Sequence, residues 1–435
     1  MARVLISFLG TGKKKDGDNA DGDYESASYK IDGKDYSAKF IADALIKAYS
    51  IDKVILIGTV KSMWDEVYAN FAEDNLDADI WERLQKIRQC VSHESELALK
   101  GIDNETVVEI EVAKETIEKV LPGNGSKIVF IKYGLNDVEL DDNISKILGI
   151  EDYLNENDEI YFDITHGFRS LPMVLMNCII YLQNVSNKTL TIKKITYGNL
   201  DVSSELGYAP VIDLSNKLLN LSDWINGAYA FKEFGKGYQI AKLLDERLAE
   251  ISRRINNLSD LLSLNYIYEL PKAIKEFIDI YKLEEQRLPS RAKLSLKPAI
   301  EEFQNYGLDN SSVLWKFQFN LANWYYEKQN YIASYITLAE SVISYCCTKI
   351  NNNGGKRDVN NKGDRDDVKQ LIISNDSRIQ PGIYKLYESK HLREIRNCLA
   401  HNNNKDVINF DEYNDDNGIK NQLKKFIDDL AKIMK

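Results

Sequence analysis

The feature of this sequence that most constrains its fold is a change of pattern near residue 215. Before that point, short β-branched or apolar runs alternate with helical stretches, and after it the strand-like runs disappear. Alternation of strands and helices is typical of a mainly parallel sheet with helices on both faces. Long segments with a 3.6-residue apolar period indicate helices instead. The sequence therefore predicts an α/β, Rossmann-like N-terminal domain with a parallel sheet, followed by an all-α domain.

The apolar runs place the expected elements along the chain. Strands are expected over Arg3–Leu9, Lys53–Ile57, Lys127–Ile131, Glu159–Asp163 and Lys193–Thr196, with Val107–Val112 as a further candidate. Helices are expected over Ser37–Tyr49, Ser62–Phe71, Leu171–Leu182, Leu214–Trp224, Ala241–Leu262, Leu314–Tyr326, Ile332–Ile350 and Leu386–Ala400. The basic stretch Arg287–Lys297 is interpreted as a connection between helices, and Asn351–Asp367 as a flexible loop. The predicted domains are 1–213, a helical connector over 214–300, and 301–435.

Composition limits the classes of function. A chain of 435 residues is too long for one ordinary core. The net charge of −11 is opposite in sign to that of most proteins that bind duplex nucleic acid, so any contact with RNA must be local, in a pocket lined by a few cations. Four histidines and five scattered cysteines, none in a CxxC, predict no metal site. Pro172–Leu182, the longest apolar run, is too short to span a bilayer, and no secretory leader is recognised; a soluble, cytoplasmic protein is expected.

Four of the predicted strands run into a glycine that lies beside hydroxyl or amide side chains. These strand ends are Gly10-Thr11-Gly12, Gly58-Thr59, Asp163–Ser170 and Gly198-Asn199. In open α/β sheets, ligands bind beyond the carboxyl ends of the strands. Glycine lets backbone N–H groups approach a ligand, and these groups suit phosphates together with hydroxyls. A phosphate-bearing ligand is therefore expected at this edge of the sheet.

The loop after the Glu159–Asp163 strand carries the most specific pattern. Ser170 is placed to cap the following helix, and the unpaired N–H groups of a helix N-terminus attract anions. Arg169 adds a fork of donors, and His166 can stack on a base or donate to a phosphate. Gly167 lies between these side chains. The plain alternative is an ordinary strand–helix turn that needs its glycine and its cap.

Standard nucleotide and calcium motifs are incomplete in this sequence. Gly10 and Gly12 begin a GxGxxG, but Lys15 stands at its third glycine position, and no GxxxxGK[ST] is present. The acidic run over residues 16–23 lacks the spacing of an EF-hand. It is interpreted as a solvated loop that could fold over a ligand beside the first strand.

The expected helix Leu386–Ala400 ends in a second constellation, Arg396-Asn397-Cys398-Leu399-Ala400-His401. Arg396 can bind a phosphate with two donors, and His401 can transfer a proton near neutral pH. An arginine and a histidine suffice in principle for metal-independent RNA cleavage, in which the ribose 2′-hydroxyl attacks the adjacent phosphorus. Asn397 adds a polar group on the same turn, and Glu340 could orient Arg396. Taken alone, Arg-x4-His is a weak motif whose alternative is a solvated helix end.

Together these motifs resemble a known family. The Asp163–Pro172 loop resembles the signature of CRISPR-associated Rossmann-like (CARF) sensor proteins, and Arg396–His401 resembles the Arg-x4-6-His motif of HEPN ribonucleases. In this order, the chain is similar to the CARF–HEPN ancillary ribonucleases of type III CRISPR systems. Residues 214–297 are the part that the resemblance covers least.

The resemblance implies an activity, partners and a composite site that the spacing of residues along the chain does not indicate by itself. Such proteins are homodimers that bind one cyclic oligoadenylate across the two-fold axis and build one composite ribonuclease site from both copies of Arg396 and His401. It thus implies a single-stranded RNA substrate, no metal or cofactor, and an activator for which we favour cyclic tetra-adenylate over hexa-adenylate. With the loop residues above, the expected activator contacts are Gly10, Thr11, Gly12, Gly58, Thr59, His166, Gly167, Arg169 and Ser170. Whether the homodimer assembles into higher oligomers is left open.

Three alternatives remain at this point. The chain could be a ligand-gated regulator without catalysis, although no helix-turn-helix with a basic recognition helix is found. It could be a HEPN nuclease with its own RNA target, whose first domain binds another nucleotide. It could also be a ring nuclease that degrades cyclic oligoadenylate, with a C-terminal domain that serves only dimerisation.

Overall fold

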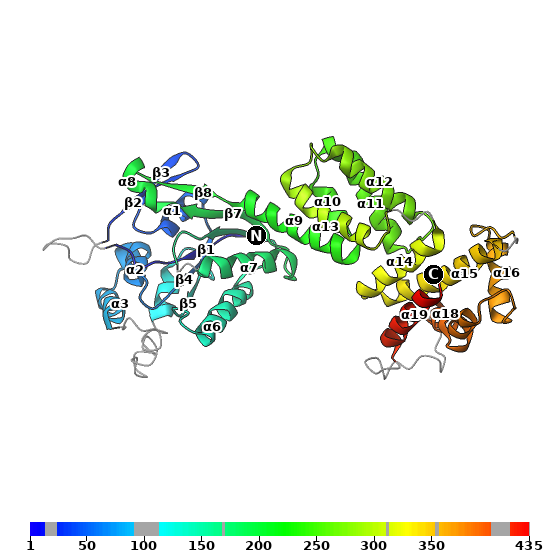
Figure 1. Cartoon of the computed structure of the whole chain (residues 1–435). Coiled ribbons are helices and arrows are strands. Elements are labelled where there is room, and N and C mark those ends of the chain that lie inside the picture. Colours follow the sequence, from blue (N-terminus) through cyan, green and yellow to red (C-terminus); the bar gives the residue numbers. More distant parts are fainter. Residues whose placement is uncertain are drawn as a thin grey trace. The chain divides into compact units, whose positions relative to one another are not determined.

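The computed structural model describes residues 1–13, 24–90, 113–167, 170–309, 313–352, 356–401 and 418–434, without the side chains of 87–90 and 352. These residues form two compact units, Met1–Asn220 and Leu221–Lys435 (Figure 1). The candidate strand Val107–Val112 and the acidic loop 16–23 lie outside the described residues. Each unit is described by itself below.

The first unit is built on a sheet of eight strands in the order β3-β2-β8-β7-β6-β1-β4-β5. Its strands are β1 (Arg3–Phe8), β2 (Ala27–Ile31), β3 (Lys34–Ala38), β4 (Lys53–Gly58), β5 (Lys127–Phe130), β6 (Glu159–Asp163), β7 (Thr191–Gly198) and β8 (Ala209–Asp213). Five neighbouring pairs are parallel, and β2–β3 and β7–β8 are antiparallel. The predicted mainly parallel α/β sheet is therefore confirmed, and each of the five expected strands is present.

Helices cover both faces of this sheet because the central strands are apolar on both sides. On one face Leu5, Val54 and Leu56 pack with α1 (Ile41–Tyr49), α2 (Trp64–Ala72) and α3 (Ala78–Cys90). On the other face Val4, Ile6 and Ile55 pack with α6 (Asp137–Leu148) and α7 (Leu171–Asn184). The described part of the unit also contains a helical segment over residues 113–120, 3₁₀ turns at Glu73–Asn75, Gly149–Tyr153 and Leu200–Val202, and α8 (Ser203–Leu206).

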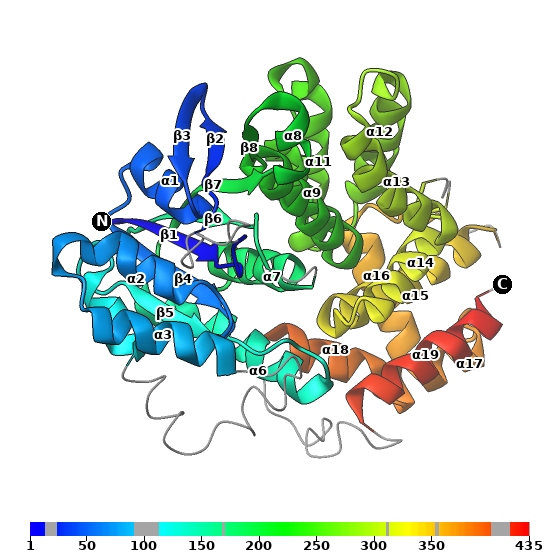
Figure 2. The ribbon, with the colours of Figure 1, turned by 90° about the vertical axis from the view of Figure 1, so that its left-hand side faces the viewer.

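The β2–β3 hairpin is a feature that the sequence prediction missed. A helix was expected from Ser37, but β3 continues to Ala38 and α1 begins only at Ile41. Asp32 and Gly33 connect the two strands with φ of 46° and 84°. Positive φ at both central residues suits the right-handed twist of a hairpin, and Asp-Gly is the usual sequence for it. Figure 2 shows the hairpin at one end of the sheet.

The second unit consists of helices, as the sequence predicts. They are α9 (Ser215–Phe234, which begins in the first unit), α10 (Tyr238–Leu243), α11 (Ala249–Ser263), α12 (Leu270–Glu284), α13 (Ser290–Asn305), α14 (Leu314–Glu327), α15 (Tyr331–Asn352), α16 (Lys362–Ile373), α17 (Pro381–Tyr384), α18 (Leu392–His401) and α19 (Ile419–Ile433), with a 3₁₀ turn at Glu246–Leu248 and a π turn at Lys385–Ser389. One buried apolar cluster joins parts of α9 to α15, and another joins parts of α14 to α19. Among the described residues, none of the helices is long and apolar enough to cross a membrane.

Four expected boundaries in this unit are wrong. The connection expected over Arg287–Lys297 is mostly helix α13, whose buried face of Ala292, Leu296 and Phe303 tolerates Pro298 within it. The loop expected up to Asp367 is helical from Lys362. The segment 241–262 divides into α10 and α11. The segment 386–400 is interrupted before α18 at His391, whose φ is 68°.

Candidate functional site

The first candidate site lies at the carboxyl ends of β1, β4 and β6. Three hydrogen bonds connect the loop after β1 to β4 and to the loop after β4. Leu9 N donates to Ile57 O at 2.7 Å, Ser62 Oγ donates to Leu9 O at 2.7 Å, and Met63 N donates to Gly10 O at 3.0 Å. The two glycine-bearing loops that the sequence singled out are therefore neighbours.

Close packing explains why two of these positions are glycine. Gly12 has φ of 68°, and a Cβ there would lie 2.5 Å from the ring of Tyr24. A Cβ on Gly58 would lie 2.7 Å from Ser62 Oγ. A real Cβ does not fit at such distances, so a side chain at either position would push the loops apart.

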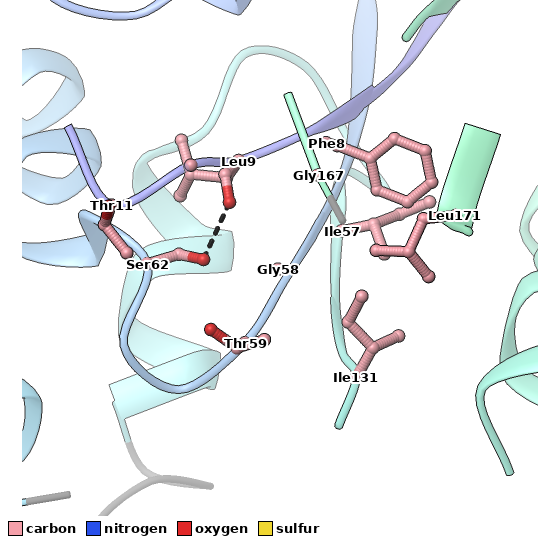
Figure 3. Close-up of a pocket in the computed structure, with 11 residues that line it drawn as sticks. Phe8, Leu9, Thr11, Ile57, Gly58, Thr59, Ser62, Ile131, Gly167 and Leu171 are labelled. Atoms are coloured by element: carbon pink, nitrogen blue, oxygen red, sulfur yellow. Dashed lines mark hydrogen bonds between the residues drawn. The ribbon is translucent and has the colours of Figure 1, made fainter. Parts of the chain in front are cut away.

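Two cavities flank the loop after β1. The first has a volume of about 200 Å³ and is lined by Phe8, Leu9, Gly10, Thr11, Ile57, Gly58, Thr59, Ser62, Ile131, Gly167 and Leu171. Figure 3 shows its apolar side chains, such as Phe8 and Leu171, on one side and the hydroxyls of Thr11, Thr59 and Ser62 on the other. Five of the residues expected to contact a ligand therefore line one cavity.

The second cavity is larger, about 670 Å³, and more polar. Gly10 and Thr11 line it as well, together with Gly12 and His166. The sequence prediction missed its other wall, which includes Lys13, Ser28, Tyr29, Lys39, Ser203 and Tyr208. Part of that wall is the β2–β3 hairpin, so the Asp-Gly turn is the signal that could have found it.

Asp163 holds the end of β6 in place. Its buried carboxylate accepts hydrogen bonds from Ser7 Oγ at 2.7 Å and Thr165 Oγ1 at 2.6 Å. Thr165 Oγ1 in turn accepts one from Gly198 N at 2.7 Å, which ties the loop after β6 to the end of β7. Burial raises the pKa of the Asp163 carboxyl, and these hydrogen bonds oppose the rise. Three strand ends are thereby joined through one carboxylate.

His166 follows on the same loop. Burial lowers the pKa of its imidazole, and the nearby charge of Asp163 opposes that shift only in part. The ring is therefore neutral at pH 7, so it can stack on a base or donate one hydrogen bond, but it carries no charge to pair with a phosphate.

Two expectations about this loop have different outcomes. Ser170 precedes α7, but its side chain makes no capping hydrogen bond, so the predicted side-chain cap is wrong. Its φ of −74° and ψ of −32° are already helical, whereas a capping residue is usually extended. Arg169 lies outside the described residues.

The second candidate site lies on α18, within the second unit. Leu392, Ile395 and Cys398 of this helix are buried, which leaves Arg396 half-buried beside them. The guanidinium of Arg396 donates to Asn397 Oδ1 and to Glu340 Oε1, both at 3.0 Å. The expected contact with Glu340 is therefore present.

Glu340, on α15, is shared by a second arginine that the sequence prediction missed. Its Oε2 accepts from Arg365 Nη2 at 2.6 Å. Arg365 is buried on α16, where Nη1 also donates to Ser344 Oγ at 2.8 Å. Because residues 340, 365 and 396 come from three helices, no spacing along the chain predicts this cluster.

His401 is the last residue of α18 and is exposed. Within the part of the chain that the structure describes, it makes no hydrogen bond or ion pair with Arg396 or Asn397. One chain thus brings Arg396, Asn397 and Glu340 together and leaves His401 open to solvent. The described residues contain no group of three or more histidine, cysteine or acidic side chains placed to hold a metal ion.

The first unit is thus an α/β domain with a mainly parallel sheet and glycine-lined cavities at its strand ends, and the chain continues from it into a helical domain. Residues 4–201 match the family described as "CRISPR system endoribonuclease Csx1, CARF domain". Residues 220–309 match "CRISPR-associated protein MJ1674, second domain". The chain belongs to the CARF-domain CRISPR-associated proteins, which confirms that part of the resemblance.

One curated relative resembles nearly the whole chain. The CRISPR-associated protein MJ1674 of Methanocaldococcus jannaschii is 31% identical, over 98% of this chain and 66% of that protein. The chain therefore spans slightly less than two thirds of its relative's length. A solved structure, Enterococcus italicus Csm6 bound to cyclic hexa-2′-fluoro-hexa-dAMP, aligns over 100% of this chain and 93% of that one, with 12% identity and a TM-score of 0.34. A TM-score this low does not establish a shared fold.

Proposed function

We propose that this protein is a cyclic oligoadenylate-activated, metal-independent endoribonuclease of type III CRISPR antiviral defence. In this proposal residues 301–435 are a HEPN domain that cuts single-stranded RNA in the cytoplasm. The observation that carries the proposal is the arrangement on α18, where Arg396 is held beside Asn397 and Glu340 and the helix ends in the exposed His401.

The cavities beside the β1 loop support the sensing half of the proposal. The backbone at Gly10 and the hydroxyls of Thr11 and Thr59 suit phosphates, while the neutral ring of His166 suits a base. A cyclic oligoadenylate carries both groups in every repeat. Its proposed contacts are the nine residues predicted from the sequence, with cyclic tetra-adenylate favoured over the hexa-adenylate ring.

The chemistry of the second half follows from the side chains on α18. The 2′-oxygen attacks the adjacent phosphorus, and the imidazole of His401 accepts the 2′-hydroxyl proton. The guanidinium of Arg396 binds the negative charge that builds up on the phosphate oxygens. The bond to the 5′-oxygen then breaks, and that oxygen takes a proton. The products are a 2′,3′-cyclic phosphate and a 5′-hydroxyl, so the reaction needs no water or metal ion.

A homodimer completes this scheme. One imidazole cannot be the neutral base for the 2′-hydroxyl and the protonated acid for the 5′-oxygen at the same time. Two copies of His401 therefore share these two roles. The exposure of His401 at the end of α18 leaves it accessible to a second copy of the chain. Each protomer would also contribute one Arg396 to the same site.

The test is a comparison of the full-length protein with its His401→Ala variant. We expect the variant to lose RNA cleavage by at least about a hundredfold, because general acid–base catalysis contributes roughly 10²–10⁴. It should bind cyclic tetra-adenylate as the unchanged protein does, since the ligand cavities lie in the first unit. Cleavage by fluorescence and ligand binding by calorimetry measure the two properties separately.

Undiminished cleavage by His401→Ala would contradict the catalytic role. If the unchanged protein binds the ring but cuts no RNA, a ligand-gated regulator without catalysis becomes the better account. If the ring itself is consumed, the protein is a ring nuclease. If it cuts RNA while binding neither ring, the first domain recognises another nucleotide.

A further inference from the structure

A third cavity, of about 560 Å³, lies within the second unit next to Arg396. It is lined by Tyr268, Glu340, Ile343, Asn360, Lys362, Arg365, Asp366, Lys369 and Arg396. These residues come from α15, α16, α18, the segment before α16 and the turn before α12. The proposed ribonuclease chemistry uses only Arg396 of this set, with Glu340 to orient it, so the remaining residues call for another role.

The charge of this cavity is opposite to that of the whole chain. Four lining side chains are cationic and two are acidic, whereas the protein carries −11. Lys362 and Lys369 lie two turns apart on the face of α16 that bears Arg365. Among the described residues, neither lysine has a hydrogen-bonded or ion-paired partner. These two ammonium groups are therefore available to an anion.

The two arginines are held differently. Arg365 is buried and bonded to Glu340 and Ser344, so it acts as a fixed part of the wall. Arg396 is bonded to Glu340 and Asn397, and its buried Nε has no hydrogen-bond acceptor among the described residues. A buried donor without a partner is uncommon, and it lies on the residue proposed to contact the reacting phosphate.

Tyr268 adds an aromatic surface to the same cavity. Its side chain is 43% exposed, and the guanidinium carbon of Arg365 lies 5.8 Å from its ring centroid. Cationic side chains that follow a phosphate backbone, next to an aromatic ring on which a base stacks, are the usual means of binding single-stranded nucleic acid.

We infer that this cavity binds a nucleotide of the single-stranded RNA substrate next to the scissile phosphate. Lys362 and Lys369 bind the backbone phosphates, and a base stacks on Tyr268. The inference rests on the proposed function, because it takes Arg396 as the point where the RNA is cut. It gives the acidic protein the local cationic pocket that RNA binding requires.

The test uses the full-length protein with His401→Ala as background, so that RNA binds without being cut. A fluorescein-labelled single-stranded RNA of mixed sequence is titrated at several salt concentrations, with cyclic tetra- and hexa-adenylate both present. The Lys362→Ala/Lys369→Ala double variant should bind about tenfold more weakly. Its salt dependence should flatten by about 1.4 in log Kd per log salt, since each phosphate contact on a single strand contributes roughly 0.7.

Two further variants separate the parts of the cavity. Tyr268→Ala should weaken binding by about fivefold or more while its salt dependence stays unchanged, because stacking releases no counterion. Lys275→Ala, an exposed lysine on α12 outside the cavity, is the matched control and should bind as the background protein does.

The outcomes distinguish the two claims. If the double lysine variant binds RNA with the same affinity and salt dependence as Lys275→Ala, the cavity is not an RNA site. The proposed function would still stand, provided that the protein with His401 intact cuts RNA. If the background protein binds no RNA and the intact protein cuts none, the inference and the proposed function both fail.

Discussion

The two candidate sites are built from different material. At the strand ends, the smaller cavity is lined by glycines, hydroxyls and apolar side chains, and buried Asp163 fixes the loops through neutral donors. On α18, the site consists of charged side chains in which one carboxylate, that of Glu340, holds two guanidiniums. The first site is therefore sensitive to volume and the second to charge.

The difference follows from how each fold makes a site. The carboxyl ends of parallel strands lie at the same edge of a sheet, so the loops that follow them meet there whatever their side chains are. Where the backbones of these loops approach each other closely, glycine is needed. Helices meet through side chains, so a site between them depends on which residues happen to face one another. Variants that change only volume or only charge should therefore affect the two sites differently.

The largest effect is expected from Gly12→Ala. Its Cβ would lie 2.5 Å from the ring of buried Tyr24, whose hydroxyl is bonded to Asp65, and the residue has φ of 68°. Strain and overpacking together should lower the free energy of unfolding of the first domain by roughly 2–4 kcal/mol. Urea unfolding, followed by the circular dichroism of the full-length protein, measures this loss.

Gly33→Ala is the matched control for Gly12→Ala. Gly33 has φ of 84°, but nothing lies within 4 Å of the position of its Cβ. It should show the backbone strain alone, about 1 kcal/mol. Equal losses for the two variants would mean that the loop after β1 is not closely packed.

A smaller effect is expected from Glu340→Gln, which changes charge but scarcely changes volume. Arg396 would lose the carboxylate that orients it, so we expect kcat for RNA cleavage to fall about tenfold, or about 1.4 kcal/mol, with KM little changed. Stopped-flow or reporter kinetics measure both constants, and a thermal melt shows whether the fold is retained.

The control is Glu388→Gln, which removes a carboxylate that pairs with Arg393 in the same part of the unit. Its kcat should stay within about twofold of that of the unchanged protein, because Arg393 takes no part in the proposed chemistry. If both variants lose the same activity, Glu340 stabilises the domain but does not position Arg396.

The smallest effect is expected from Asp163→Asn and depends on pH. Burial raises the pKa of Asp163 in the folded protein, so its contribution to stability is complete below the unfolded pKa and is lost as the pH rises through the folded one. The stability of the unchanged protein relative to Asp163→Asn should therefore fall as the pH rises above about 4, the ordinary pKa of an aspartate carboxyl. Parallel thermal melts measure this difference, and a constant or growing advantage of the unchanged protein would contradict the pKa direction.

The sequence predicted most of the first domain because topology governs it. Five apolar runs indicated five strands, and the rule that ligands bind at carboxyl ends led to Gly10, Thr11, Gly58 and Thr59. The hairpin was missed because its alternation of polar and apolar residues was overlooked beside Asp32-Gly33. The side-chain cap at Ser170 was wrong because a residue type that favours capping does not fix φ and ψ.

The second domain was less predictable. Arg396 and Glu340 were recognised from the motif and the preceding helix, but Arg365, Lys362 and Lys369 were assigned to or near a loop. The start of α16 at Lys362 was missed because the first turn of this helix is polar. Arg365 was missed as a partner of Glu340 because the two residues lie on different helices, which only packing brings together. The stretch Arg287–Lys297 was interpreted as a connection, although most of it lies in α13, where the buried apolar face outweighs the cost of Pro298.

The proposed activity is tested by cleavage of a fluorescent single-stranded RNA reporter in EDTA, with and without cyclic tetra-adenylate and cyclic hexa-adenylate. We predict cleavage only when one of the rings is present, with cyclic tetra-adenylate the more effective, and we predict that EDTA leaves the rate unchanged. Cleavage that needs no ring, cleavage that EDTA abolishes, or no cleavage with either ring would show that the protein is not a ring-activated, metal-independent ribonuclease.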